Sequence, residues 1–60
     1  MKSLKELREE KGLTQVQASI ALGISYQGYR FYETGYYIKM KPSLEEKISE
    51  LFGVEYHYVR

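Results

Sequence analysis

Residues 26–34 place polar and aromatic side chains at spacings that could read the edges of DNA base pairs. In the stretch YQGYRFYET, Gln27 and Arg30 are three residues apart, so a helix would put them on one face. Glutamine can bond to adenine N6 and N7, and arginine to guanine O6 and N7. Tyr26 and Phe31 lie beside them and could press on a thymine methyl group. We call these four residues the base-reading face.

A second group of side chains could bind the phosphate backbone. Thr14 and Gln15 lie at a predicted helix start, where free backbone N–H groups favour an anion. Ser25 lies at the next predicted helix start, and Lys39 and Lys41 follow in a loop. The lysines would add affinity that falls with salt. The competing interpretations are plain helix capping for Thr14 and ordinary solubility for the two lysines.

Two short helices within residues 14–35 must position these side chains. Thr14 and Gln17 have the spacing of a capping box, and Gly23 supplies the left-handed residue that ends the first helix. Ser25 then caps the second helix. Because so few residues separate the two helices, they must meet at a steep angle. The pattern predicts a helix-turn-helix.

One further helix is predicted on either side of this pair. Residues 3–12 and 43–53 each begin with a serine, have a glutamate three residues later and end at a glycine. Pro42 is expected just outside the start of the last helix. The tail, residues 54–59, fits either a further helical turn or a short strand. We predict one compact all-α domain of four to five helices over residues 1–60.

The apolar residues of the central pair divide into a predicted core and an exposed set. Val16 and Ile20 fall away from the core stripe, and they form either a contact patch or a surface covered by the loop at Tyr36 and Tyr37. Gly28 interrupts the second helix at a cost of about 1 kcal/mol relative to alanine. The predicted core comprises Leu13, Ala18, Leu22, Ile24, Tyr29 and Tyr32.

The composition argues against several function classes. The chain has 60 residues, a net charge of +1 and no cysteine, so disulfides and thiolate metal sites are excluded. His57 is the single histidine, and no aspartate or cysteine is present to orient it or to act beside it. We expect no enzyme activity, no metal and no cofactor. No apolar run approaches the roughly 18 residues that span a membrane, so a cytoplasmic location is expected.

The stretch LTQVQASIALGISYQGYRFYETG, residues 13–35, resembles the Cro/repressor-like (XRE-type) helix-turn-helix family of bacterial and phage transcription regulators. The resemblance extends through LKELREEKGLT before it and PSLEEKISELFGV after it. It implies a five-helix domain whose helix from Ser25 lies in the major groove of DNA. It also implies that Arg8 and Glu33 form a pair that ties the first helix to the end of the third.

Matching positions of the family give the same site residues. Thr14 and Gln15 match positions that bind phosphate, and the loop that holds Lys39 and Lys41 often touches the DNA backbone. The positions of Tyr26, Gln27, Arg30 and Phe31 match those that reach base edges.

We therefore expect a sequence-specific regulator that binds double-stranded DNA, a repressor of the bacterial or phage type. Such domains usually pair, so a homodimer is expected, either free or only on DNA. Tyr56, Tyr58 and Val59 of the tail, with the fourth helix, are the predicted contact between subunits. The alternative is a protein-interaction module of the same fold, such as an antirepressor or antitoxin-like subunit, that uses the aromatic third helix.

Overall fold

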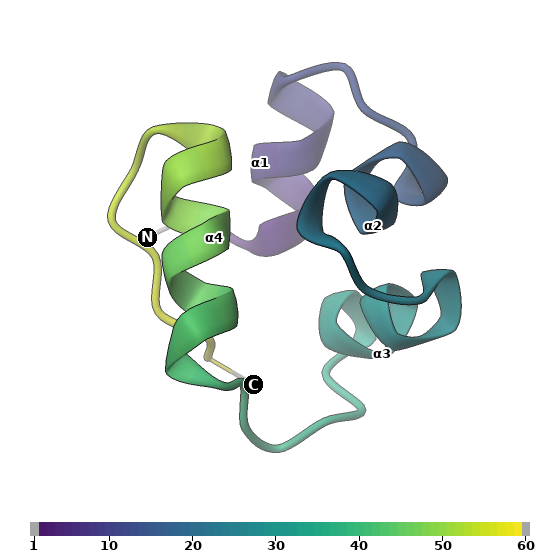
Figure 1. Cartoon of the computed structure of the whole chain (residues 1–60), viewed down its shortest axis with the longest axis vertical. Coiled ribbons are helices and arrows are strands. Elements are labelled where there is room, and N and C mark those ends of the chain that lie inside the picture. The colour runs from purple at the N-terminus through teal and green to yellow at the C-terminus, as the bar shows by residue number, and fades with distance from the viewer. Residues whose placement is uncertain (1, 60) are drawn as a thin grey trace.

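Four helices make up the part of the chain that this computed structural model describes, residues 2–59. They are α1 (Leu4–Glu10), α2 (Gln15–Leu22), α3 (Tyr26–Thr34) and α4 (Pro42–Phe52). Figure 1 shows α2 and α3 on one side of the molecule, α4 on the other and α1 behind them. The all-α prediction is confirmed, with four helices rather than five over the described residues. None of these helices is long and apolar enough to cross a membrane.

Local sequence signals set the ends of the central helices as predicted. Thr14 Oγ1 accepts a hydrogen bond from Gln17 N at 3.1 Å, and Gln17 Oε1 accepts one from Thr14 N at 2.9 Å. The same box precedes α1. Ser25 Oγ caps α3 by accepting from Gly28 N at 3.0 Å. Gly23 ends α2 with a φ of 72°, in the left-handed region that favours glycine.

The start of α4 differs from the prediction. Lys41 occupies the N-cap position without a side-chain hydrogen bond, and Pro42 is the first helical residue. Proline suits this position because its fixed φ is helical and its missing N–H would have no partner within the helix. Ser43 therefore lies inside the helix, and the predicted cap at Ser43 is wrong.

Side chains from all four helices meet in one hydrophobic core with the loop before α4 and the tail. Tyr29, Leu22 and Ile48 are the largest fully buried side chains. Of the predicted core residues, Ala18, Leu22 and Tyr29 are buried, whereas Leu13, Ile24 and Tyr32 are partly buried and pack against them. The complete core comprises Leu4, Leu7, Ala18, Leu22, Tyr29, Met40, Leu44, Ile48 and Tyr56.

The tail, residues 54–59, runs beside α4 as an irregular segment (Figure 1), so both conformations predicted for it are wrong. Tyr56 N donates to Ser49 Oγ at 3.1 Å, and Tyr58 N donates to Glu45 Oε2 at 2.7 Å. Both acceptors are side chains of α4. They take the place of the backbone partners that a helix or a strand would supply.

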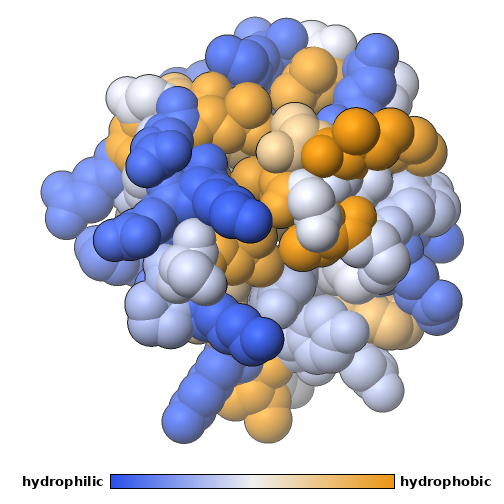
Figure 2. All heavy atoms as spheres, in the orientation of Figure 1, coloured by the Kyte–Doolittle hydropathy of each residue, from blue (hydrophilic) through white to orange (hydrophobic). Residues whose placement is uncertain are grey.

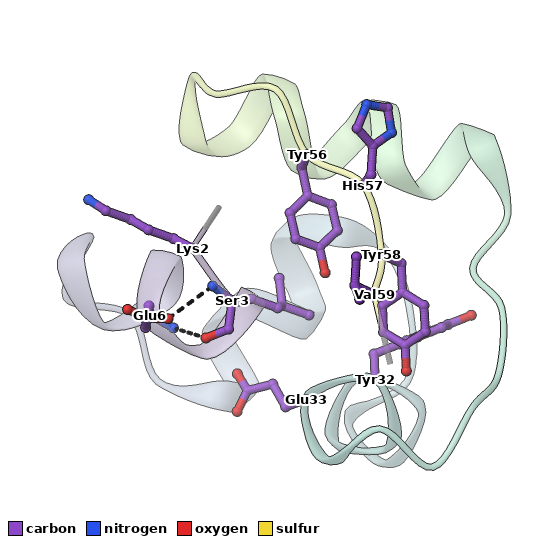
Figure 3. A pocket seen from close by; sticks show the side chains of 10 residues that line it. Lys2, Ser3, Glu6, Tyr32, Glu33, Tyr56, His57, Tyr58 and Val59 are labelled. Carbon is purple, nitrogen blue, oxygen red and sulfur yellow. Dashed lines mark hydrogen bonds between the residues drawn. The ribbon is translucent and has the colours of Figure 1, made fainter.

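The tail tyrosines pack on their own domain. Tyr56 is only 5% exposed, and the Tyr58 ring meets the Tyr32 ring edge-on with the centroids 5.5 Å apart. Figure 3 shows these rings around a pocket that Glu33 also lines. Val59, by contrast, is 75% exposed. Tyr56 is thus a core residue, and it does not offer the apolar contact to a second subunit that the sequence predicts.

Candidate nucleic-acid interface

The base-reading face lies on the side of α3 that points away from the core. Tyr29, on the opposite side of the helix, is fully buried, and this burial fixes the rotation of α3 about its axis. The structure brings the four predicted residues together around one shallow depression. Thr34 completes its lining, and its position is explained by its spacing of four residues from Arg30. The depression is lined by Tyr26, Gln27, Arg30, Phe31 and Thr34.

Arg30 is oriented by a neighbouring aromatic ring. Its guanidinium carbon lies 5.6 Å from the centroid of the Tyr26 ring, a distance at which a cation is attracted to the ring face. The two residues are four apart on α3, one helical turn. Both are exposed, so the guanidinium can still donate to a base. Tyr26 therefore restricts where Arg30 points before any DNA is present.

Phe31 is held by the loop that follows α3. Its ring centroid lies 4.4 Å from that of Tyr36 and 5.4 Å from that of Tyr37. The loop therefore packs on the base-reading face and does not cover α2. Val16 and Ile20 remain 48% and 73% exposed. The sequence left this choice open because pairing of the loop with Phe31 depends on how α3 ends.

The two residues at the start of α2 are held differently. The Thr14 hydroxyl oxygen accepts from the backbone and keeps its own O–H to donate. Gln15 Nε2 donates to Glu33 Oε1 at 3.1 Å, and Gln15 Oε1 accepts from the Tyr26 hydroxyl at 3.5 Å. The amide of Gln15 has two N–H groups, so one of them remains for a phosphate oxygen. Gln15 thus also joins the start of α2 to α3, a structural role that the sequence did not indicate.

The remaining predicted phosphate ligands are exposed. Ser25 lies at the N-cap of α3, beside backbone N–H groups that favour an anion. Lys39 and Lys41 lie in the segment between α3 and α4, and neither forms an ion pair within residues 2–59. Their charges are therefore available to a phosphate backbone.

A partly buried ion pair connects α3 to α1. Arg8 Nε donates to Glu33 Oε2 at 2.7 Å, and Arg8 Nη1 donates to the carbonyl oxygen of Leu13 at 2.9 Å. The Arg8 and Glu33 side chains are 12% and 4% exposed. Burial raises the pKa of the Glu33 carboxyl, but hydrogen bonds, led by the one from Arg8, outweigh this effect and lower the pKa below its ordinary value. The pair predicted from the sequence is thus in contact and ionised.

The Tyr29 phenol lies in the core beside this pair. Burial, and secondarily the Glu33 carboxylate, raises its pKa, so the phenol stays protonated. His57 lies on the exposed side of the tail, where its Nε2 is 3.3 Å from Glu55 Oε1. No group of three side chains that could hold a metal occurs within residues 2–59.

Comparison with known proteins finds a family match that covers nearly the whole chain. A family model with the description helix-turn-helix matches residues 4–59. This range contains all four helices and every residue of the candidate interface. No curated protein and no solved structure matches the chain.

Proposed function

Because the chain belongs to the Cro/repressor-like (XRE-type) helix-turn-helix family of DNA-binding regulators, we propose that it binds double-stranded DNA sequence-specifically with α3 in the major groove. The observation that carries the proposal is the exposed stripe of donors and apolar surface on α3, next to the start of α2. Two unpaired lysines follow in the loop between α3 and α4. An α-helix with its side chains is about 10 to 12 Å across. The major groove, about 12 Å wide, admits it.

Each residue of the base-reading face has a distinct task. Arg30 donates two hydrogen bonds to guanine O6 and N7, and Gln27 pairs with adenine N6 and N7, each contact being worth about 1 to 3 kcal/mol of discrimination. Phe31 presses on a thymine methyl group, and its ring neighbours keep it in place. Tyr26 adds a second aromatic edge and orients Arg30.

Side chains at the starts of α2 and α3 and in the loop after α3 fix α3 on the DNA backbone. Thr14, Gln15 and Ser25 bind phosphate at two helix starts, where the backbone N–H groups add to the attraction. Lys39 and Lys41 bind phosphate from the loop beyond α3. These contacts set the register in which the base-reading face meets the bases.

The regulatory role that fits this binding mode is repression by occupancy, in the bacterial cytoplasm, by a protein that a bacterium or a phage encodes. A bound domain denies other proteins access to the DNA that it covers. Two copies on one operator would place their α3 helices about 34 Å apart, on successive turns of the major groove. We therefore include a homodimer, formed free or on DNA, in the proposal.

Selection of bound sequences from a random pool of double-stranded DNA tests the proposal. We expect an enriched motif, and an affinity for that motif that falls as salt concentration rises. A matched selection with the Arg30→Ala variant should lose preference at one position of the motif. Absence of any enriched motif, together with binding that salt does not affect, would refute the proposal.

One observation favours the alternative, a protein-interaction module. Tyr36, whose ring packs on Phe31, and Ile38, two residues further along the same loop, are each 68% exposed. Exposed apolar surface of this kind can bind a protein partner. The same selection separates the two functions, because a module that binds only protein enriches no DNA sequence.

A further inference from the structure

An exposed apolar surface on α2 lies outside the base-reading face. Val16 and Ile20 are four residues apart, one helical turn, and Ile20 is 73% exposed. Figure 2 shows hydrophobic atoms over α2 next to hydrophilic side chains over α4. A groove runs between these two helices, and Ile20, Lys47, Glu50 and Leu51 are among the residues that line it. No residue of the base-reading face lines this groove.

Two side chains of opposite charge line the groove without forming an ion pair with each other. Lys47 and Glu50 are exposed on α4, and neither forms an ion pair within the described residues. The Lys47 ammonium lies near Gly23, 3.9 Å from the position that a Cβ on this glycine would take. Gly23 ends α2, and the C-terminal end of a helix attracts a cation. The surface is complementary to a second copy of itself because it carries an unpaired cation, an unpaired anion and an exposed isoleucine side by side.

The other exposed apolar side chains are less suited to pairing. Tyr36 packs on Phe31 of the base-reading face, which must stay free for DNA, and Ile38 lies in the same loop. Val54 lies in a depression with Glu10, whose charge is already paired with Lys2. In residues 55–59 of the tail, the exposed large apolar residue is Val59, which is 75% exposed.

We propose that two copies of this chain pair through the groove between α2 and α4. In a two-fold arrangement each contact occurs twice, so Lys47 of each copy meets Glu50 of the other, and Ile20 of each copy packs against the other copy's groove. Both base-reading faces remain exposed, because the groove shares no residue with them. The inference rests on the proposed function in that it identifies the surface of the homodimer.

The size of the domain sets the strength of this pairing. A stable interface buries about 800 Å² on each partner, which is about a fifth of the 4210 Å² surface of the described chain. The groove with Ile20 and Val16 is a smaller part of the surface. Free subunits should therefore exchange between monomer and dimer, and a DNA site with two half-sites should favour the dimer by bringing two copies together.

A charge-reversal experiment on the full chain tests the proposal. Sedimentation equilibrium up to about 1 mM protein covers the range of weak association. Lys47→Glu alone and Glu50→Lys alone should each weaken self-association by at least about tenfold, because like charges then face each other twice. An equimolar mixture of the two variants should restore it, since every contact in the mixed dimer again joins a cation to an anion.

Matched controls separate the contact from net charge and from folding. Glu46→Lys changes the net charge as Glu50→Lys does, at a residue that does not line the groove, and should leave association unchanged. Thermal melting followed by circular dichroism shows that each variant is folded. Ile20→Ser should weaken association without affecting binding to a single DNA half-site.

Two outcomes would overturn the proposal. A wild-type chain that stays monomeric to about 1 mM and binds a two-half-site DNA without cooperativity has no pairing surface. A dimer that persists in Lys47→Glu and Glu50→Lys uses another surface. Failure of the proposed function looks different: the chain would then bind no half-site at all, whatever its oligomeric state.

Discussion

The Glu33 carboxylate at the end of α3 lies 2.7 Å from Arg8 Nε of α1, and the Glu33 side chain is only 4% exposed. Two elements distant in the sequence are joined at this point, 25 residues apart. Because the Glu33 side chain is buried and the Arg8 side chain is only 12% exposed, the pair fixes the direction of α3 more than it adds to stability. The orientation of the base-reading face thus depends on a contact that includes none of its residues.

Loss of the arginine should therefore be far more damaging than loss of a surface lysine. Arg8→Met leaves the Glu33 charge buried without its cation, and we expect the free energy of unfolding to fall by about 3 to 5 kcal/mol. Lys2→Met is the matched control: it breaks the Lys2–Glu10 pair, whose side chains are 56% and 53% exposed, and should cost less than about 1 kcal/mol. Urea denaturation measures both. If the two variants lose equal stability, the buried pair has no special role. The double variant Arg8→Met/Glu33→Met should recover part of the loss.

Stability should also depend on pH through Glu33. Burial alone would raise the pKa of this carboxyl, but hydrogen bonds from Arg8 and Gln15 more than reverse the effect, so the folded-state pKa is lowered. The unfolded chain then binds the proton at higher pH than the folded chain does. The contribution is complete above the ordinary glutamate pKa, about 4.3, and is lost as pH falls through the folded-state pKa. The urea midpoint of the wild type should fall more steeply below about pH 4.3 than that of Glu33→Gln. Parallel curves would contradict this.

Base reading and phosphate binding should respond to mutation in different ways. Arg30→Ala is expected to relax preference at one base position, with a loss of about 1 to 3 kcal/mol on the preferred base. Lys41→Ala should weaken binding to all sequences alike and reduce the slope of log affinity against log salt by about 1. Titration of DNA variants at several salt concentrations distinguishes the two. An Arg30→Ala protein with unchanged preference would remove Arg30 from the base-reading face.

Tyr26 should affect affinity through Arg30. Tyr26→Phe keeps the ring under the guanidinium and is expected to retain the preference that Arg30 confers, whereas Tyr26→Ala should lose part of it.

A side chain at Gly28 would disturb the cap of α3 in its present geometry. A Cβ at this position would lie 2.9 Å from Ser25 Oγ, the oxygen that caps α3. Gly28→Ala should therefore gain about 1 kcal/mol in helix propensity and lose a similar amount as the cap is displaced. In a Ser25→Ala background the clash is absent, so Gly28→Ala should stabilise by about 1 kcal/mol. Thermal denaturation of the four variants of this cycle measures the coupling, and simple additivity would contradict it.

The sequence predicted those features of the fold that depend on neighbouring residues. The Thr14 box, the Ser25 cap and the turn at Gly23 each use groups within four residues of one another, so their types and spacing were enough. The predicted start of α4 was wrong because two local signals competed. Pro42 is the first helical residue, so Ser43 lies inside the helix and does not cap it.

Features that join distant segments could not be predicted from spacing. Backbone N–H groups of the tail donate to the side chains of Glu45 and Ser49 on α4. No periodicity within residues 54–59 indicates these contacts. The contacts of Phe31 with the following loop likewise depend on how the chain leaves α3. The pair of Arg8 and Glu33 was found only because the resemblance to a family supplied it.

Some residues of the base-reading face are freely exposed and others pack on the loop after α3. This difference decides which residues can be changed to alter the recognised DNA sequence. Gln27 and Arg30 are exposed, whereas Phe31 is held by two rings of the loop. Changes at residues 27 and 30 can therefore alter the recognised sequence while the scaffold stays intact, in evolution or in a designed library. A change at Phe31 must be accompanied by compensating changes in the loop.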